Sequence, residues 1–427
     1  MARKRDRRVA ADSSGRRNRD GTSNRQNQSK ESKLTIVFFV VFLVSASISM
    51  LVYRIKYAPR KNSLLDVHQR GLVKANMNYR EILAENENVL GNMSHRHYTY
   101  PVLAYITPWN SKGYDLAKRF NSKFTHLSPI WYTLNSQGTK LILEGRHNAD
   151  MGWISDLRKK GGAQVVPRVV LEAFHKDLLR KKKLRDKAIN LIVTECKEMD
   201  YDGIVLESWS RWAAYGFLHD PVMRNMAVLF IKQLGQALHS ANSGTNNKQL
   251  QLIYVIGPPH SERLQEHDFG PQDLQILSDA VDGFSLMTYD FSGPHHPGPN
   301  APLKWVRSVL QMLLGSTREG AHPLAHKIFL GINFYGNDFP LSEGSGGGAI
   351  TGRDYLSLLE KHQPELQWEN NSGEHFFLYF DHNQIKHAVF YPTLLSISMR
   401  LEEAHLWGTG ISIWEIGQGL DYFFNLL

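Results

Sequence analysis

The sequence predicts an α/β protein whose main domain is a closed (β/α)8 barrel, and three observations carry this prediction. From about Tyr98 onward, short apolar runs with strand character alternate with amphipathic helical stretches, which is the pattern of a parallel sheet. Eight such runs follow one another, the number of strands that closes a barrel. An open doubly wound sheet is the alternative, but no G-x-G-x-x-G follows the first run.

The eight expected strands share a high content of apolar and β-branched residues. They are the runs 101–108, 124–132, 163–171, 201–207, 250–257, 282–289, 327–335 and 408–415. The last two runs begin 81 residues apart (408 − 327), too far for one crossover helix. Between them lie three short segments with strand character, ELQWEN, HFFLYF and KHAVFY. We therefore expect a small α+β insertion at about 340–395, between strands seven and eight. The whole TIM-barrel domain would span residues 98–427.

The first 33 residues differ from the rest of the chain in composition. Residues 1–33 hold eleven Lys/Arg against four Asp/Glu and almost no apolar side chains, so we expect a disordered basic tail. This tail accounts for most of the formal net charge of +9, which leaves 39 basic and 37 acidic residues in the remaining chain. A nearly neutral folded part without a recognisable binding motif argues against nucleic acid as a partner.

Residues 34–53 form a run of twenty without a charge, long enough for a helix to cross a bilayer. The alternatives are a cleaved signal peptide or a buried core helix, and we expect a retained single-pass type II signal-anchor. The tail would then face the cytosol, residues 54–97 would form a stalk with one helical piece, and the barrel would lie in the lumen or outside the cell. A lysosomal location, or secretion after cleavage, is compatible with this orientation.

Two N-x-S triplets, at Asn92 and Asn370, are candidate glycosylation sites on that side of the membrane. The chain has a single cysteine, Cys196, in a helical stretch, so the domain must be stable without an internal disulfide. The histidines show no metal-ligand spacing, and we expect no metal and no cofactor.

Ligands of such barrels bind at the carboxyl ends of the strands, where this sequence places many aromatic residues and few charges. Aromatic faces suit the C–H faces of sugars, and a neutral groove suits a neutral polymer. The candidate ligand-binding residues are Tyr105, Trp109, Trp131, Glu207, Trp209, Met287, Tyr289, Asp290, Tyr335 and Trp414.

Four of these strand ends resemble glycoside hydrolase family 18, the chitinases and chitinase-like proteins. The matching motifs are AYITPW (104–109), YDG (201–203), MTYD (287–290) and GISIWE (410–415). The resemblance covers about residues 98–427 and implies the barrel, the insertion and a site for chito-oligosaccharides, which are polymers of β-linked N-acetylglucosamine. The C-terminal sequence looks closer still to the chitinase domain-containing protein 1 branch.

The sequence departs from this family where the chemistry should be. Family chitinases end the fourth strand in Asp-Gly-x-Asp-x-Asp-x-Glu, where the final Glu protonates the glycosidic oxygen. Counted from Asp202, the later positions hold Val205, Glu207 and Trp209, which would share one face of a continuing strand. Because an indole cannot transfer a proton near neutral pH, we assign a catalytic role to no residue.

Glu207 is the carboxylate nearest to the missing acid. We expect Glu207 to orient or bind a ligand. The alternative is that it is a buried acid paired with a barrel residue such as Arg168 or Tyr289. The overall expectation is a carbohydrate-binding protein that does not hydrolyse its ligand. The alternatives are an active hydrolase that uses Glu207, Asp290 or Glu415, and a vestigial barrel that serves as a partner-binding scaffold.

The basic run HKDLLRKKKLRDK (175–187) has two interpretations. The simpler is a solvated helix face with its leucines turned to the barrel. The other is a second site for anionic glycolipids or membrane headgroups.

Overall fold

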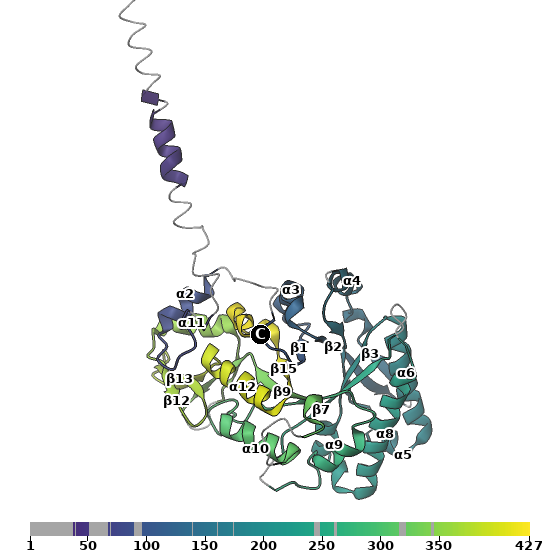
Figure 1. Cartoon of the computed structure of the whole chain (residues 1–427). Helices are drawn as coiled ribbons and strands as arrows, with labels where there is room; N and C mark the ends of the chain where they lie inside the picture. The colour runs from purple at the N-terminus through teal and green to yellow at the C-terminus, as the bar shows by residue number, and fades with distance from the viewer. Residues whose placement is uncertain are drawn as a thin grey trace, which may run out of the picture. The chain divides into compact units, whose positions relative to one another are not determined.

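The computed structural model describes residues 37–38, 40–50, 67–68, 70–88, 96–138, 140–159, 161–173, 175–242, 248–259, 263–315, 322–342 and 346–427 (Figure 1). The chain divides into two compact units, residues 1–60 and 61–427, and the predicted barrel lies in the second. The basic tail 1–33 and Asn92 fall outside the described residues, as do both ends of the predicted anchor 34–53. Among the helices that are described, none is both long and apolar enough to cross a membrane.

Eight parallel strands form a closed barrel at the centre of the second unit. In chain order they are β1 (Val102–Ile106), β2 (His126–Gln137), β5 (Arg168–Leu171), β6 (Gly203–Glu207), β7 (Gln251–Ile256), β8 (Gly283–Leu286), β9 (Ile328–Asn333) and β15 (Gly410–Trp414). Each pairs in parallel with the next, and β1 closes the ring by pairing with both β2 and β15. Every predicted run overlaps one of these strands, and only β2 extends past its run, to Gln137, so the barrel is confirmed.

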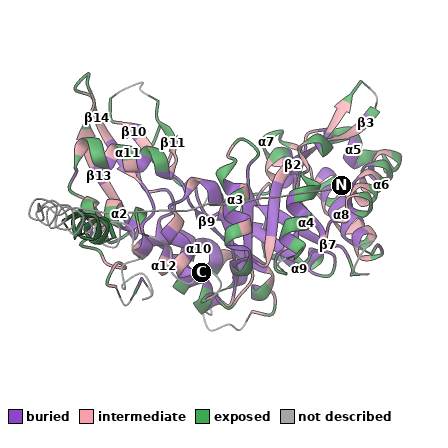
Figure 2. Ribbon diagram, turned by 90° about the horizontal axis from the view of Figure 1, so that it is seen from above, coloured by how far each residue is buried: buried purple, intermediate pink, exposed green. Residues whose placement is uncertain are grey.

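Helices cover the outside of the barrel (Figures 1 and 2). They are α3 (Lys112–Arg119), α4 (Met151–Lys159), α5 (His175–Arg180), α6 (Lys182–Glu198), α7 (Trp209–Ala214), α8 (Pro221–His239), α9 (Pro271–Leu277), α10 (Leu303–Leu314) and α12 (Leu394–Trp407). The longest, α8, begins where Asp220 accepts a hydrogen bond from the backbone N–H of Val222 and Pro221 occupies the first turn. Two short strands, β3 (Lys140–Glu144) and β4 (Gln164–Val165), pair with β2.

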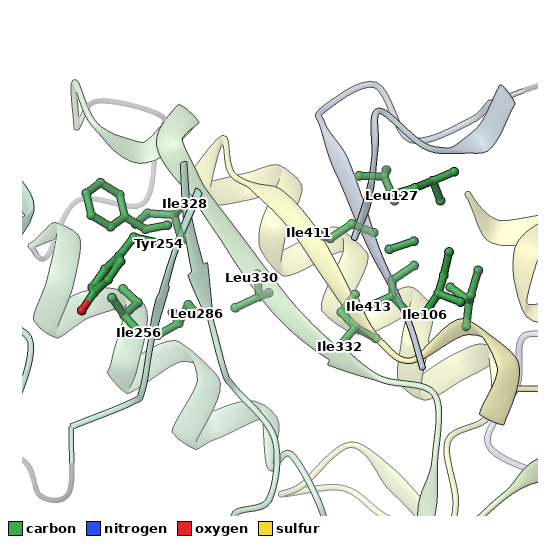
Figure 3. Close-up of a cluster of buried hydrophobic side chains, with 14 of the residues drawn as sticks. Ile106, Leu127, Tyr254, Ile256, Leu286, Ile328, Leu330, Ile332, Ile411 and Ile413 are labelled. Carbon is green, nitrogen blue, oxygen red and sulfur yellow. The ribbon is translucent and has the colours of Figure 1, made fainter. Parts of the chain in front are cut away.

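Alternation along the strands divides the core into two apolar layers. One layer fills the barrel and contains Leu103, Tyr105, Val166, Val205, Ile253, Val255 and Phe329. The other lies between the strands and the helices, and Figure 3 shows part of it, including Ile332, Ile411 and Ile413. Residues of β6 with odd numbers therefore face the barrel centre, which places Val205 and Glu207 there.

The predicted insertion between the last two barrel strands is a five-stranded antiparallel sheet with one helix. Its elements are β10 (Gly336–Pro340), β11 (Gly348–Ile350), α11 (Gly352–His362), β12 (Gln367–Glu369), β13 (Glu374–Phe380) and β14 (Lys386–Phe390), with strand order β11-β10-β14-β13-β12. Asn370 is exposed in the turn between β12 and β13. The insertion starts directly after β9 and ends just before α12.

The described part of the expected stalk, residues 67–68 and 70–88, packs against the domain. It contains the helix α2 (Tyr79–Asn86), which contacts α11 and lies beside it in Figure 1. The Tyr79 hydroxyl donates to Gln363, the residue after α11, at 3.0 Å, and Val67 and Ile82 are buried. We call residues 67–88 the N-terminal strap.

A buried histidine of β13, His375, links the strap to the insertion. Its Nε2 lies 2.8 Å from the carbonyl oxygen of Ala75, and its Nδ1 lies 2.8 Å from the Thr393 hydroxyl. Since a carbonyl only accepts, Nε2 carries the proton and Nδ1 accepts from Thr393. Burial lowers the pKa of His375. The hydrogen bond to the Ala75 carbonyl opposes this shift, but burial outweighs it, so the buried histidine favours the neutral imidazole.

We predict that strap docking weakens as the pH falls. A histidine exposed to solvent after undocking has a pKa of about 6.5, and burial under the docked strap lowers this pKa. The free energy of docking therefore becomes less favourable as the pH falls below about 6.5. The strap carboxylates Glu81 and Glu85 form ion pairs with Lys74 and Arg70. Desolvation raises the pKa of Glu81, but hydrogen bonds from Lys74 and from the Asn78 backbone N–H outweigh it and lower the pKa. Amide hydrogen exchange of residues 75–88, corrected for intrinsic rates, should be faster at pH 5 than at pH 7.5.

The control is His375→Gln, whose amide does not titrate. Its exchange should change much less between the two pH values than that of the wild type. An equal pH effect in both proteins would assign the change to other groups.

Candidate functional site

Trp209, at the position where the sequence resemblance implies a catalytic acid, does not continue the β6 strand face. The strand ends at Glu207, Ser208 turns the backbone, and Trp209 begins α7. The expected shared face of Val205, Glu207 and Trp209 is therefore wrong for Trp209. Its side chain is held in place, because Nε1–H donates to the His267 carbonyl at 2.9 Å and the Arg224 guanidinium lies 5.0 Å from the indole centroid.

Glu207 forms an ion pair with Arg168 of the neighbouring strand β5, and both side chains are almost buried. The guanidinium of Arg168 also lies 5.0 Å from the ring centroid of Trp414, in a cation–π contact. The Ser210 hydroxyl donates to Glu207 Oε1 at 3.4 Å. The pairing of Glu207 with Arg168 is therefore present in the structure, and contact of Glu207 with a ligand stays a prediction. Burial lowers the pKa of Arg168, and Tyr105 and Tyr289 oppose this shift.

Tyr105 and Trp414 complete the barrel centre around this ion pair. Their ring centroids lie 5.2 Å apart, and the Tyr105 hydroxyl donates to the Ser285 hydroxyl at 2.8 Å. Tyr105 is buried, and burial raises the pKa of its hydroxyl. Val205 packs below them in the barrel layer. The barrel centre is thus filled by side chains of its own strands.

Asp290 lies four residues after the end of β8, in the connection to α10, and has a left-handed backbone, φ +60°. Its N–H donates to Asn300 Oδ1 at 2.9 Å, and its Oδ1 accepts a short hydrogen bond from the Tyr335 hydroxyl. Desolvation raises the pKa of Asp290, while the bond from Tyr335 lowers it. Such contacts fix the carboxylate in one orientation at the end of β8.

A cavity of about 630 Å³ opens beside the barrel centre, between α7, the segment after β7 and the segment after β8. Its volume is within the range typical of small-molecule sites, about 300–1,000 Å³. Its lining residues are Trp209, Ser210, Ala213, Ala214, His219, Gly257, Pro258, Pro259, His267, Asp268, Phe269, Met287, Tyr289, Asp290, Phe291 and Trp305. This space, which we call the side cavity, is the candidate ligand site.

The structure separates the ten predicted site residues into groups. Four line the side cavity: Trp209, Met287, Tyr289 and Asp290. Tyr105, Glu207 and Trp414 lie in the barrel centre, and Tyr335 is hydrogen-bonded to Asp290.

The remaining two predicted residues lie elsewhere. A register shift of the β2–β5 pairing between Ile130 and Tyr132 accompanies the turn of Trp131 toward the helix layer, where its Nε1 donates to Tyr114 at 2.7 Å. Trp109 is 72% exposed and does not line the side cavity.

Sequence analysis missed several residues of the side cavity, including His219, His267, Phe291 and Trp305. Phe291 directly follows the MTYD motif and could have been included for that reason. The others lie in loops and helices, where no local pattern indicates that they face a common space.

Comparison with known proteins gives the class and then the family. The fold matches that of solved chitinases: a chitinase from Chromobacterium violaceum ATCC 12472 superimposes with a TM-score of 0.63 at 20% identity, over 77% of this chain and 98% of that one. A family 18 chitinase from Cycas revoluta in complex with (GlcNAc)3 gives 0.61 at 15% identity, over 76% and 97%. Residues 102–419 match the model of the glycosyl hydrolases family 18, so the chain belongs to this family.

Two curated relatives come from Bacillus subtilis (strain 168). The uncharacterized glycosylase YvbX is 24% identical over 200 residues, 46% of this chain and 54% of the relative. A cortical fragment-lytic enzyme is 26% identical over 191 residues, 43% of this chain and 42% of the relative. The chain thus spans about half the length of the curated relatives it matches.

We predict that the buried ion pair is costly to break from either side. Arg168→Met or Glu207→Leu should each lower the free energy of unfolding by about 3–5 kcal/mol, because one charge stays buried without its partner. The double variant should recover most of that loss. Urea unfolding of the four proteins measures these differences.

Lys159→Met is the control, since the Lys159–Asp156 pair is exposed and should contribute at most about 1 kcal/mol. Strictly additive losses in the double variant would contradict a direct Arg168–Glu207 interaction.

Proposed function

We propose that the chain is a chitinase-like protein that binds chito-oligosaccharides without hydrolysing them. The observation that carries this proposal is the arrangement at the end of β6, where Trp209 replaces the acid and Glu207 is paired with Arg168. General acid catalysis needs a protonated group within about 3 Å of the glycosidic oxygen. An indole N–H is not acidic enough to transfer its proton, and an arginine partner favours the ionised carboxylate, which holds no proton.

Family membership and the side cavity support oligosaccharide binding. Related chitinases from Cycas revoluta are solved with (GlcNAc)3 and (GlcNAc)4. The side cavity offers aromatic surface together with the oriented carboxylate of Asp290, and sugars need both apolar faces and hydrogen-bond partners. Within the family, the C-terminal sequence supports assignment to the chitinase domain-containing protein 1 branch.

A partner-binding scaffold is the second candidate function. The observation that favours it is the closed barrel centre, where Arg168, Glu207, Tyr105 and Trp414 contact one another. In this case the barrel would have lost its sugar site and would present its outer surface to another protein.

The location of the protein also remains a proposal. The uncharged run 34–53 supports a signal-anchor with the barrel in the secretory pathway, and exposed Asn370 supports glycosylation there. Anionic glycolipids are less well supported, because Lys181 pairs with Asp177 and Lys182 with Asp186 on the surface of α5 and α6.

We predict that the purified protein does not turn over a fluorogenic chitobioside. The wild type and Glu207→Gln should both give rates equal to the blank at pH 5 and pH 7, because neither holds a proton donor at the glycosidic oxygen. Glu172→Gln is the matched control, since Glu172 is another carboxylate paired with an arginine, Arg211.

An active site at Glu207 would give a different pattern. The wild type would exceed the blank, and Glu207→Gln alone would lower the rate by roughly 10²–10⁴-fold. That result would overturn the non-enzymatic proposal.

A further inference from the structure

The aromatic ring of Trp414 in the barrel centre is already in contact with protein groups. The Arg168 guanidinium lies 5.0 Å from its centroid, and the ring of Tyr105 lies 5.2 Å away. Arg168 is held there by Glu207 and by burial. A sugar that stacked on the face of Trp414 that Arg168 covers would have to displace a guanidinium that is paired and nearly buried, and breaking such a pair is strongly unfavourable.

The side cavity offers aromatic surface that is still accessible. Phe291 is 53% exposed, and its ring centroid lies 5.2 Å from that of Trp305 in the first turn of α10. Ala213 and Ala214 of α7 and the prolines after β7 line the same cavity. The cavity therefore joins an apolar platform to small apolar lining residues.

Asp290 supplies a polar contact in the same space. Tyr335 donates to its Oδ1 and Asn300 accepts from its N–H, so the carboxylate is fixed while Oδ2 keeps capacity to accept hydrogen bonds. A carboxylate so placed can accept from a sugar hydroxyl or amide N–H.

On these observations, we infer that the oligosaccharide is bound in the side cavity, on Phe291 and Trp305, and not on Trp414 in the barrel centre. This inference rests on the proposed sugar-binding function. The ion pair closes the centre, and the ligand site is displaced toward β7 and β8. Glu207 reaches this site only through Ser210, which lines the cavity and donates to the carboxylate.

The charges around the side cavity define the class of sugar it accepts. Its described lining residues include two carboxylates, Asp268 and Asp290, and two histidines, His219 and His267, but neither lysine nor arginine. The histidines lie 3.9 and 3.8 Å from the carboxylates of Glu266 and Asp268, and nearby Arg224 is engaged by both carboxylate oxygens of Asp273, at 2.5 and 2.7 Å. An acidic sugar would meet the carboxylates as like charges, and each nearby cationic or histidine side chain already has a carboxylate partner. The site therefore selects neutral oligosaccharides over those with uronate or sulfate groups.

Calorimetric titration with chitotetraose tests the location. Phe291→Ala and Trp305→Leu should each weaken binding by roughly threefold to tenfold, the range expected for loss of an aromatic contact. Trp414→Leu should stay within about twofold of the wild type. The matched control is Phe380→Ala, a phenylalanine of the insertion with a similar exposure of 57%.

The titration separates failure of this inference from failure of the proposed function. If the wild type binds and Trp414→Leu alone loses binding while remaining folded by circular dichroism, the side cavity is not the site. If the wild type binds no chitotetraose at all, the sugar-binding function itself fails, and the inference fails with it.

A second titration tests the charge selection. A hyaluronan tetrasaccharide, in which glucuronate alternates with N-acetylglucosamine, should bind at least tenfold more weakly than chitotetraose at low salt. The difference should narrow in Asp290→Asn and at higher ionic strength, which screens like charges. Equal or tighter binding of the acidic tetrasaccharide would contradict the assigned ligand class.

Discussion

The Arg168–Glu207 ion pair determines how the carboxyl end of this barrel is arranged. Two charges that are nearly buried must stay together, since removing either leaves the other without compensation. Arg168 in turn packs on Trp414, and Trp414 packs on Tyr105, so the pair fills the centre with side chains from three strands and the end of a fourth. The accessible cavity consequently lies to one side, over β7 and β8.

The barrel could be predicted from the sequence because strand and helix periodicities are local properties. Each of the eight apolar runs is a strand, and the long gap before the last run marks the insertion. Glu207 facing the barrel centre also follows from alternation, as does the possibility of its pairing with Arg168. Whether Glu207 pairs with Arg168 depends on the direction that the Arg168 side chain takes. The sequence of β5 does not specify this direction.

Two predicted side-chain placements differ from the structure, each for a physical reason. Trp209 was placed by extending strand alternation past Glu207, but the chain turns at Ser208 and starts a helix. Trp131 was placed by its position in β2, but the pairing shifts register between its neighbours and its indole lies among the outer helices. The side cavity gathers residues from three separate connections, and such long-range proximity has no signature in a single sequence.

The strap gives the domain a particular response to force. Ala75 is hydrogen-bonded to His375 of β13, Tyr79 is hydrogen-bonded to Gln363 after α11, and α2 also contacts the C-terminal turn at Asp421–Leu426. A pull applied along the chain at Val67 would load these contacts one after another before it reached any barrel strand. The insertion and the C-terminal turn would thus absorb tension, and the side cavity, formed by connections on other strands, would keep its shape while the strap yields.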